Sequence, residues 1–116
     1  MAVFHLTLNG TMTGINLNKA ETFFSRFIGL MGKKRASPGL LITRCVSIHT
    51  FFMRTSIDAV FTGEGGRVVK IIHSLGPWKA VLPVRGASAV FEIEPGAASG
   101  LGIKLNDILA AARVDR

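Results

Sequence analysis

One apolar segment of the chain gathers the residues best suited to chemistry. Residues 45–61 contain the single cysteine, Cys45, one of three histidines, His49, and a carboxylate, Asp58. Polar groups in such a segment are expected to be hydrogen-bonded or functional, because burying one unpaired costs roughly 1–3 kcal/mol. A thiol, an imidazole and a carboxylate are the groups that bind zinc, or that act as nucleophile, base and orienting acid.

The spacing of Cys45 and His49 argues against a shared metal ion or a catalytic pair. If residues 45–53 form one strand, Cys45, His49 and Met53 share a face. The two reactive residues then lie roughly 13 Å apart at about 3.3 Å per residue. That is too far for one zinc ion at about 2.0–2.3 Å from each ligand. The spacing therefore favours a buried cysteine beside a hydrogen-bonded histidine, and we predict neither a metal site nor a catalytic residue.

Two further residues have both a structural and a functional interpretation. Asp58 either accepts backbone N–H groups after the bend at residues 54–56 or pairs with Arg54; alternatively, it lines the rim of a pocket that contains His49. Trp78 is either a loop anchor or a lid over an apolar hole. The candidate ligand-binding residues are Cys45, His49, Met53, Asp58 and Trp78.

The hydrophobic periodicity predicts the elements that must position these residues. An Asn9-Gly10 turn joins strands at residues 3–8 and 11–17, and Asn18 is a suitable N-cap for an amphipathic helix over residues 19–31. Further strands are expected at residues 40–43, 46–53, 57–61, 67–73 and 87–94, with an irregular stretch at 75–85, one helical turn at 97–101, and either helix or strand at 108–114. In residues 87–94 the alternation assigns Glu92 to a face opposite Phe91. The sum is one α+β domain, residues 1–116, with a mostly antiparallel sheet that is barrel-like or strongly twisted.

The composition limits the classes of function. With 48% hydrophobic residues in 116, the chain can bury one core, and no apolar run approaches the roughly 20 residues of a membrane span. The N-terminus does not resemble a signal peptide, and a free thiol fits a reducing compartment, so we predict a cytoplasmic protein. The net charge of +7 favours acidic partners such as nucleic acid. With no Tyr and one Trp, however, no set of exposed rings suggests a platform for stacking bases.

Several motifs together resemble the bacterial and archaeal family called domain of unknown function 192. The matching segments are Gly29-Leu30-Met31, His49-Thr-Phe-Phe-Met53, Ile57-Asp58-Ala-Val-Phe61, residues 85–96 and residues 102–107. Two positions depart from its pattern: Phe52 precedes the central methionine, and Asn106 replaces a usual glycine, although Asn tolerates positive φ. The resemblance implies a compact, mostly antiparallel domain packed with a helix, and no established activity. The combination of Cys45 and His49 resembles a bacterial subgroup, and many relatives in the family are exported.

From these observations we expect a non-enzymatic module that binds a small molecule or a protein segment, without a cofactor. Its site would be a cleft near His49, Met53 and Asp58. Two alternatives stay open: a metal- or thiol-dependent enzyme that uses Cys45, His49 and Asp58, and a basic accessory protein that binds nucleic acid.

Overall fold

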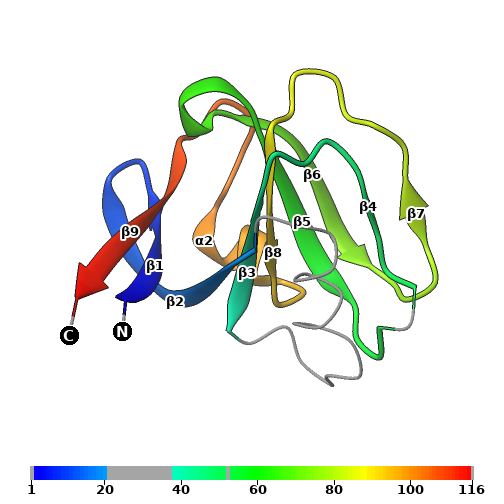
Figure 1. Ribbon diagram of the computed structural model, residues 1–116, viewed down its shortest axis with the longest axis horizontal. Coiled ribbons are helices and arrows are strands. Elements are labelled where there is room, and N and C mark those ends of the chain that lie inside the picture. Colours follow the sequence, from blue (N-terminus) through cyan, green and yellow to red (C-terminus); the bar gives the residue numbers. More distant parts are fainter. Residues whose placement is uncertain (1, 21–37, 52, 116) are drawn as a thin grey trace.

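The computed structural model describes residues 2–20, 38–51 and 53–115. Most of them belong to strands (Figure 1). In chain order the elements are β1 (Ala2–Leu8), β2 (Thr11–Ala20), β3 (Gly39–Thr43), β4 (Ile48–His49), β5 (Ile57–Thr62), η1 (Glu64–Gly66), β6 (Val68–Leu75), β7 (Ala80–Val81), β8 (Ala89–Ile93), α2 (Ala97–Leu101) and β9 (Leu109–Asp115).

Seven strands form one sheet in the order β6-β5-β8-β3-β2-β1-β9. Neighbours in this sheet are antiparallel except β2 and β3, which run parallel with Leu17 opposite Gly39. A parallel pair requires a crossover of about a dozen residues or more, and 18 residues separate Ala20 from Gly39. The predicted α+β class with a mostly antiparallel sheet is therefore confirmed.

The two edge strands of this sheet, β6 and β9, approach each other where each begins. An isolated bridge joins Arg67 to Ile108, and the backbone N–H of Val68 donates to the Asp107 carbonyl at 2.8 Å. The N–H of Asn106 returns a bond to the Val68 carbonyl at 2.9 Å, and Asn106 takes the positive φ of 74° that its sequence position suggested. Beyond this contact the sheet stays open, so it is a twisted sheet and not a closed barrel.

The central strands β3, β5 and β8 carry apolar side chains on both faces and so divide the core in two. Along β5, Ala59 and Phe61 pack into one cluster, while Val60 between them packs into the other. The first cluster takes in Ile48 and Met53. The second cluster takes in residues of β1, β9 and α2. Whether a side chain of β5 enters the first or the second cluster therefore depends on whether its position along the strand is odd or even.

Strands β4 and β7 pair with each other in a separate two-stranded sheet, His49 opposite Ala80. Figure 1 shows this pair on the side of the molecule away from the two termini. We call residues 44–51 and 53–56, together with residues 76–88, the β4–β7 lobe. The lobe carries the central motif of the sequence.

Several predicted elements need comment. The strand expected at residues 46–53 is wrong in extent, because among the described residues of that range only Ile48–His49 is strand. Strand β2 continues through Lys19 and Ala20, so Asn18 is a strand residue and not a helix N-cap; the rest of the helix expected near residues 19–31 lies outside the described residues. Residues 109–115 form a strand, which decides between the two alternatives for that stretch. Within the described ranges, no helix has the length and apolar character needed to cross a membrane.

Candidate functional site

Three aromatic side chains lie in series on the β4–β7 lobe. The ring centroids of His49 and Phe51 are 4.9 Å apart, and those of Phe51 and Trp78 are 6.0 Å apart, each pair tilted by 30°. Phe51 is 39% exposed and Trp78 is 61% exposed. The sequence did not suggest this set of exposed rings, because Phe51 and Trp78, 27 positions apart, are brought together only by the fold.

The side chain of Thr50 holds the two segments of this array together. Its fully buried hydroxyl donates to the Gly76 carbonyl at 2.6 Å and accepts the backbone N–H of Lys79 at 2.9 Å. The backbone of Thr50 adds two bonds: its N–H donates to the Lys79 carbonyl at 2.8 Å, and its carbonyl accepts the N–H of Trp78 at 2.9 Å. The sequence analysis missed Thr50, whose only signal was a hydroxyl within an apolar motif.

Trp78 adopts a backbone conformation that side chains of its size rarely take. Its φ is 60°, in the left-handed region. For a bulky residue without glycine's freedom this conformation costs on the order of 1–3 kcal/mol, and such strain gathers at functional sites. Thr50 bonds to Gly76 and Lys79, which lie on either side of Trp78 in the sequence. These bonds hold Trp78 in place and project its ring outward.

His49 is ordered by its neighbour in the same motif. Its Nδ1 atom accepts the backbone N–H of Phe51 at 3.2 Å. A neutral imidazole that accepts at Nδ1 carries its proton on Nε2. His49 is half-buried, so this arrangement fixes the ring at the inner end of the series of three.

Met53 and Cys45 connect the lobe to the first core cluster. Met53 is buried in the first cluster, and Cys45 packs against the same cluster while partly buried. The Cys45 thiol donates to the Ser47 carbonyl at 2.8 Å. Both residues therefore help to pack the lobe against the first cluster.

Asp58 faces the opposite side of the main sheet. Its fully buried carboxylate accepts three backbone N–H groups: Ser74 on Oδ1 at 2.9 Å, and Gly96 and Ala98 on Oδ2, each at 3.0 Å. Ala98 belongs to the second core cluster, whereas Met53 belongs to the first. The structural interpretation, an acceptor of backbone N–H groups, matches these contacts, although the donors come from β6 and the start of α2. The structure thus brings His49 and Trp78 together through Phe51, and separates Asp58 from them.

Glu92 is a buried carboxylate that the sequence pattern concealed. It lies in β8 opposite Leu40 on one side and Ala59 on the other, and it has no exposed surface. Alternation assigned Glu92 to the face opposite Phe91, and both faces are buried because β8 is a central strand. The flanking Phe91 and Ile93, both apolar, were the available signal. In the described part of the chain, no group of three or more His, Cys, Asp or Glu side chains could hold a metal ion.

Fold and site together define a small α+β domain with an open sheet and an outlying lobe that presents an aromatic array. The model of the DUF192 family, described as Uncharacterized ACR, matches residues 4–111. The chain belongs to this family.

Relatives and solved structures agree with this assignment. A UPF0127 protein of Thermococcus sibiricus is 35% identical over 94 residues, which span 76% of this chain and 60% of the relative; the chain thus covers less than two thirds of that protein. A UPF0127 protein of Pyrococcus furiosus is 32% identical over 100 residues, 82% of this chain and 85% of the relative.

Among solved structures, a protein of unknown function from Novosphingobium aromaticivorans superposes with a TM-score of 0.80 at 25% identity, covering 93% of this chain and 84% of that one. A putative transcription regulator from Sinorhizobium meliloti gives a TM-score of 0.74 at 23% identity, covering 95% and 92%, and shows the shared fold alone.

Proposed function

We propose that this domain is a non-enzymatic binding module whose contact surface is the ring array of His49, Phe51 and Trp78. One observation carries the proposal: an exposed tryptophan is held at a φ of 60° next to a second exposed ring. Exposed aromatic side chains forgo roughly 1.5–3 kcal/mol of burial each, and the backbone strain adds to that cost. A folded chain that maintains both features is expected to use them in recognition.

The other candidate residues take supporting roles in this proposal. Met53 and Cys45 help to pack the lobe against the first cluster, and Asp58 holds the far side of β5 through its three backbone donors. The ligand then contacts rings and backbone groups of the lobe, and no bond is made or broken. A small molecule and a peptide segment both fit this description.

A thermal-shift screen against metabolites and short peptides tests the proposal. Ligands that raise the melting temperature of the wild-type protein are expected to lose most of their effect with Phe51→Ala and with Trp78→Ala. Leu82→Ala is the matched control, because Leu82 lies in the same lobe, is 84% exposed and has no ring. Shifts that persist unchanged in both ring variants would place the binding surface elsewhere and overturn the proposal.

A further inference from the structure

The charges of the β4–β7 lobe are all of one sign. The sequence from residue 44 to 56 and from 76 to 88 has no Asp or Glu, and the lobe carries four exposed cations there. The cations are Arg44, Arg54, Lys79 and Arg85. All seven acidic residues of the chain lie outside these segments. A negatively charged partner is therefore favoured, because it meets no like charge anywhere along the lobe.

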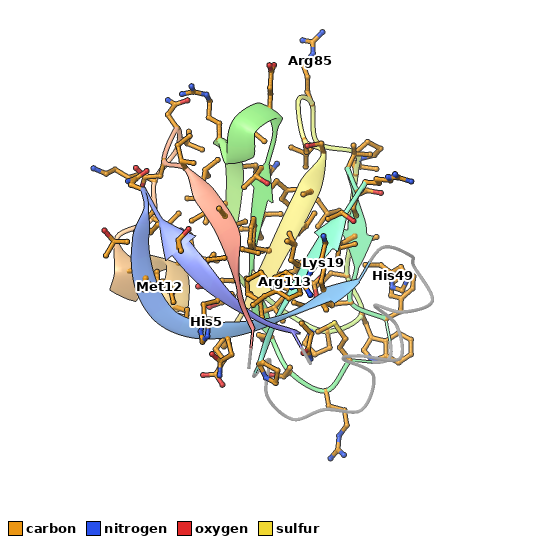
Figure 2. The ribbon with its side chains drawn as sticks, turned by 60° about the vertical axis from the view of Figure 1, so that its left-hand side comes forward. His5, Met12, Lys19, His49, Arg85 and Arg113 are labelled. Carbon is orange, nitrogen blue, oxygen red and sulfur yellow. The ribbon has the colours of Figure 1, made fainter. Side chains whose placement is uncertain are left out.

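The backbone contacts place two of these cations towards each end of the lobe. Near one end, the Val84 N–H donates to the Val46 carbonyl at 2.8 Å, which sets Arg85 close to the segment that begins with Arg44. Near the other end, Thr50 bonds to Lys79, and Arg54 follows the turn closed by the Met53 N–H on the Thr50 carbonyl. In Figure 2, Arg85 and His49 are well separated, Arg85 at the top and His49 at the right-hand edge.

The spread of the cations along the lobe favours a polyanion over a single phosphate. Thr50 lies four positions after Val46, at most roughly 13 Å of chain at about 3.3 Å per residue. A chain of phosphates can engage cations near both ends of the lobe at once.

The spacing of the three aromatic rings determines how a planar base could stack on the array. A base inserted between two rings needs them about 6.8 Å apart, twice the roughly 3.4 Å rise per base along one strand. The distances of 4.9 Å and 6.0 Å leave no such gap. A base must therefore stack against Trp78, the most exposed ring of the series. In a duplex the faces of the bases are covered by their neighbours, so this contact selects an unpaired base.

We propose that the β4–β7 lobe binds single-stranded nucleic acid, with an unpaired base stacked on Trp78 and the phosphates neutralised by the lobe's four cations. The inference rests on the proposed function and names its ligand class. Stacking supplies affinity without sequence preference, and the cations supply a dependence on salt.

The fluorescence of Trp78, the chain's one tryptophan, measures the contact directly. Titration of the wild-type protein with a twelve-nucleotide oligothymidylate at low salt is expected to quench it. Inorganic polyphosphate of similar charge should quench it far less, and the same oligonucleotide annealed to its complement should bind more weakly. If all four cations take part, affinity falls by up to about 600-fold for a tenfold rise in salt, a slope of about −2.8.

Variants separate stacking from charge. By anisotropy of a labelled oligonucleotide, Trp78→Ala should lose about 5- to 150-fold in affinity, and Trp78→Phe should recover part of that loss. Lys79→Ala should reduce the salt slope by about 0.7, whereas Lys70→Ala, an exposed lysine on β6 outside the lobe, should leave it unchanged.

Absence of binding at low salt, equal quenching by polyphosphate, or equal affinity for the duplex would each overturn the inference. If the oligonucleotide fails while ligands from the thermal-shift screen still depend on Phe51 and Trp78, the binding module stands and only its ligand class is wrong. If the oligonucleotide binds equally well to Trp78→Ala, the contact lies outside the array and the nucleic-acid site proposed here is rejected.

Discussion

The carboxylate of Asp58 holds the start of helix α2 from 40 residues away, since its Oδ2 atom accepts the backbone N–H of Ala98 at 3.0 Å. The same carboxylate accepts the N–H groups of Gly96 and of Ser74, a residue with a φ of 51°. One buried group therefore joins β5, β6 and the turn that leads into α2. A short helix of five residues depends on such a contact, because a helix this short is not stable alone.

Replacing Asp58 should destabilise the fold strongly. Asp58→Ala leaves three donors without their charged acceptor, and we expect a loss of about 3 kcal/mol in the free energy of unfolding. Urea unfolding monitored by circular dichroism measures it. Glu64→Gln, at an exposed carboxylate in η1, is the control and should change stability by less than about 0.5 kcal/mol. An Asp58→Ala protein as stable as this control would show that the three bonds are dispensable.

Thr50→Val tests the bond network that orders the aromatic array. Valine keeps the shape of threonine and removes the hydroxyl, so the Gly76 carbonyl and the Lys79 N–H lose a buried partner. We expect a cost of about 1–3 kcal/mol and a change in the near-ultraviolet circular dichroism of Trp78. Thr55→Val serves as the control, because in the described part of the chain the Thr55 hydroxyl donates to the carbonyl of its neighbour Ser56 and joins no other segment. An unaltered Trp78 signal in Thr50→Val would mean that the loop is ordered by other contacts.

Glycines in the β5–β6 turn allow steric collision and backbone strain to be measured separately. A Cβ atom at Gly63 would collide with the Gly86 carbonyl oxygen, although the φ of Gly63 is an ordinary −114°. Gly65 has the reverse situation, a φ of 68° with open space around it. We expect Gly63→Ala to cost about 2–3 kcal/mol from overpacking and Gly65→Ala about 1–2 kcal/mol from strain.

The adjacent position combines both effects, and a fourth shows neither. Gly66 has a φ of 83°, and its Cβ would collide with the carbonyl oxygen of Leu109 in β9, so Gly66→Ala should cost more than either single effect. Gly100 in α2 has open space and no positive φ, and Gly100→Ala should be neutral or stabilising by up to about 1 kcal/mol. The unfolding midpoint should be highest for Gly100→Ala, lower for Gly65→Ala, lower again for Gly63→Ala and lowest for Gly66→Ala. A Gly66→Ala protein as stable as Gly100→Ala would contradict the close approach of Gly66 to β9.

Asp107 makes part of the stability of the β9 region depend on pH. Its Oδ2 accepts the Lys104 backbone N–H at 2.9 Å, and its Oδ1 accepts the Asn9 side-chain amide at 3.1 Å. The Lys104 bond first and the Asn9 bond second lower the pKa of Asp107 below its usual 3.8. Because the folded-state pKa is the lower one, the stabilisation is complete above the unfolded value and is lost as pH falls through the folded value.

The comparison of wild type with Asp107→Asn tests this pH dependence. Wild type should be the more stable protein at pH 7, and the difference should shrink once the pH drops below 3.8. Chemical denaturation in steps from pH 7 downward measures both proteins under the same conditions. A difference that stays constant across this range would assign the effect to packing and not to ionisation.

Local signals were enough to predict the turns and the family. Asn9 and Gly10 take the positive φ values of 50° and 85° that their dipeptide favours in a hairpin. The single helical turn at residues 97–101 and the hairpin around residues 63–66 are confirmed. The signals that predicted them, turn residues and helix propensity, act within a few residues, although the helical turn is also held by Asp58 from 40 positions away.

The expected strand at residues 46–53 shows where local pattern failed. Strand formation needs a partner, and the partner here is β7, which has only two residues. Beyond Ile48–His49, the Thr50 hydroxyl and backbone bond to the loop at residues 76–79 instead. Pro77 and Pro83 in the neighbouring segment limit the ladder, since proline lacks a donor.

The sequence by itself determined the family, the turns and the inventory of reactive side chains at residues 45–61. Tertiary structure alone decided their use. Along β5, Asp58 and Val60 face the second core cluster, whereas Phe61 faces the first. The tertiary structure also decided that Phe51 meets Trp78. The reason is physical. Side-chain identity and turn propensity are local properties, whereas a hydrogen bond or a ring contact across 27 or 40 positions exists only after the sheet has placed both partners.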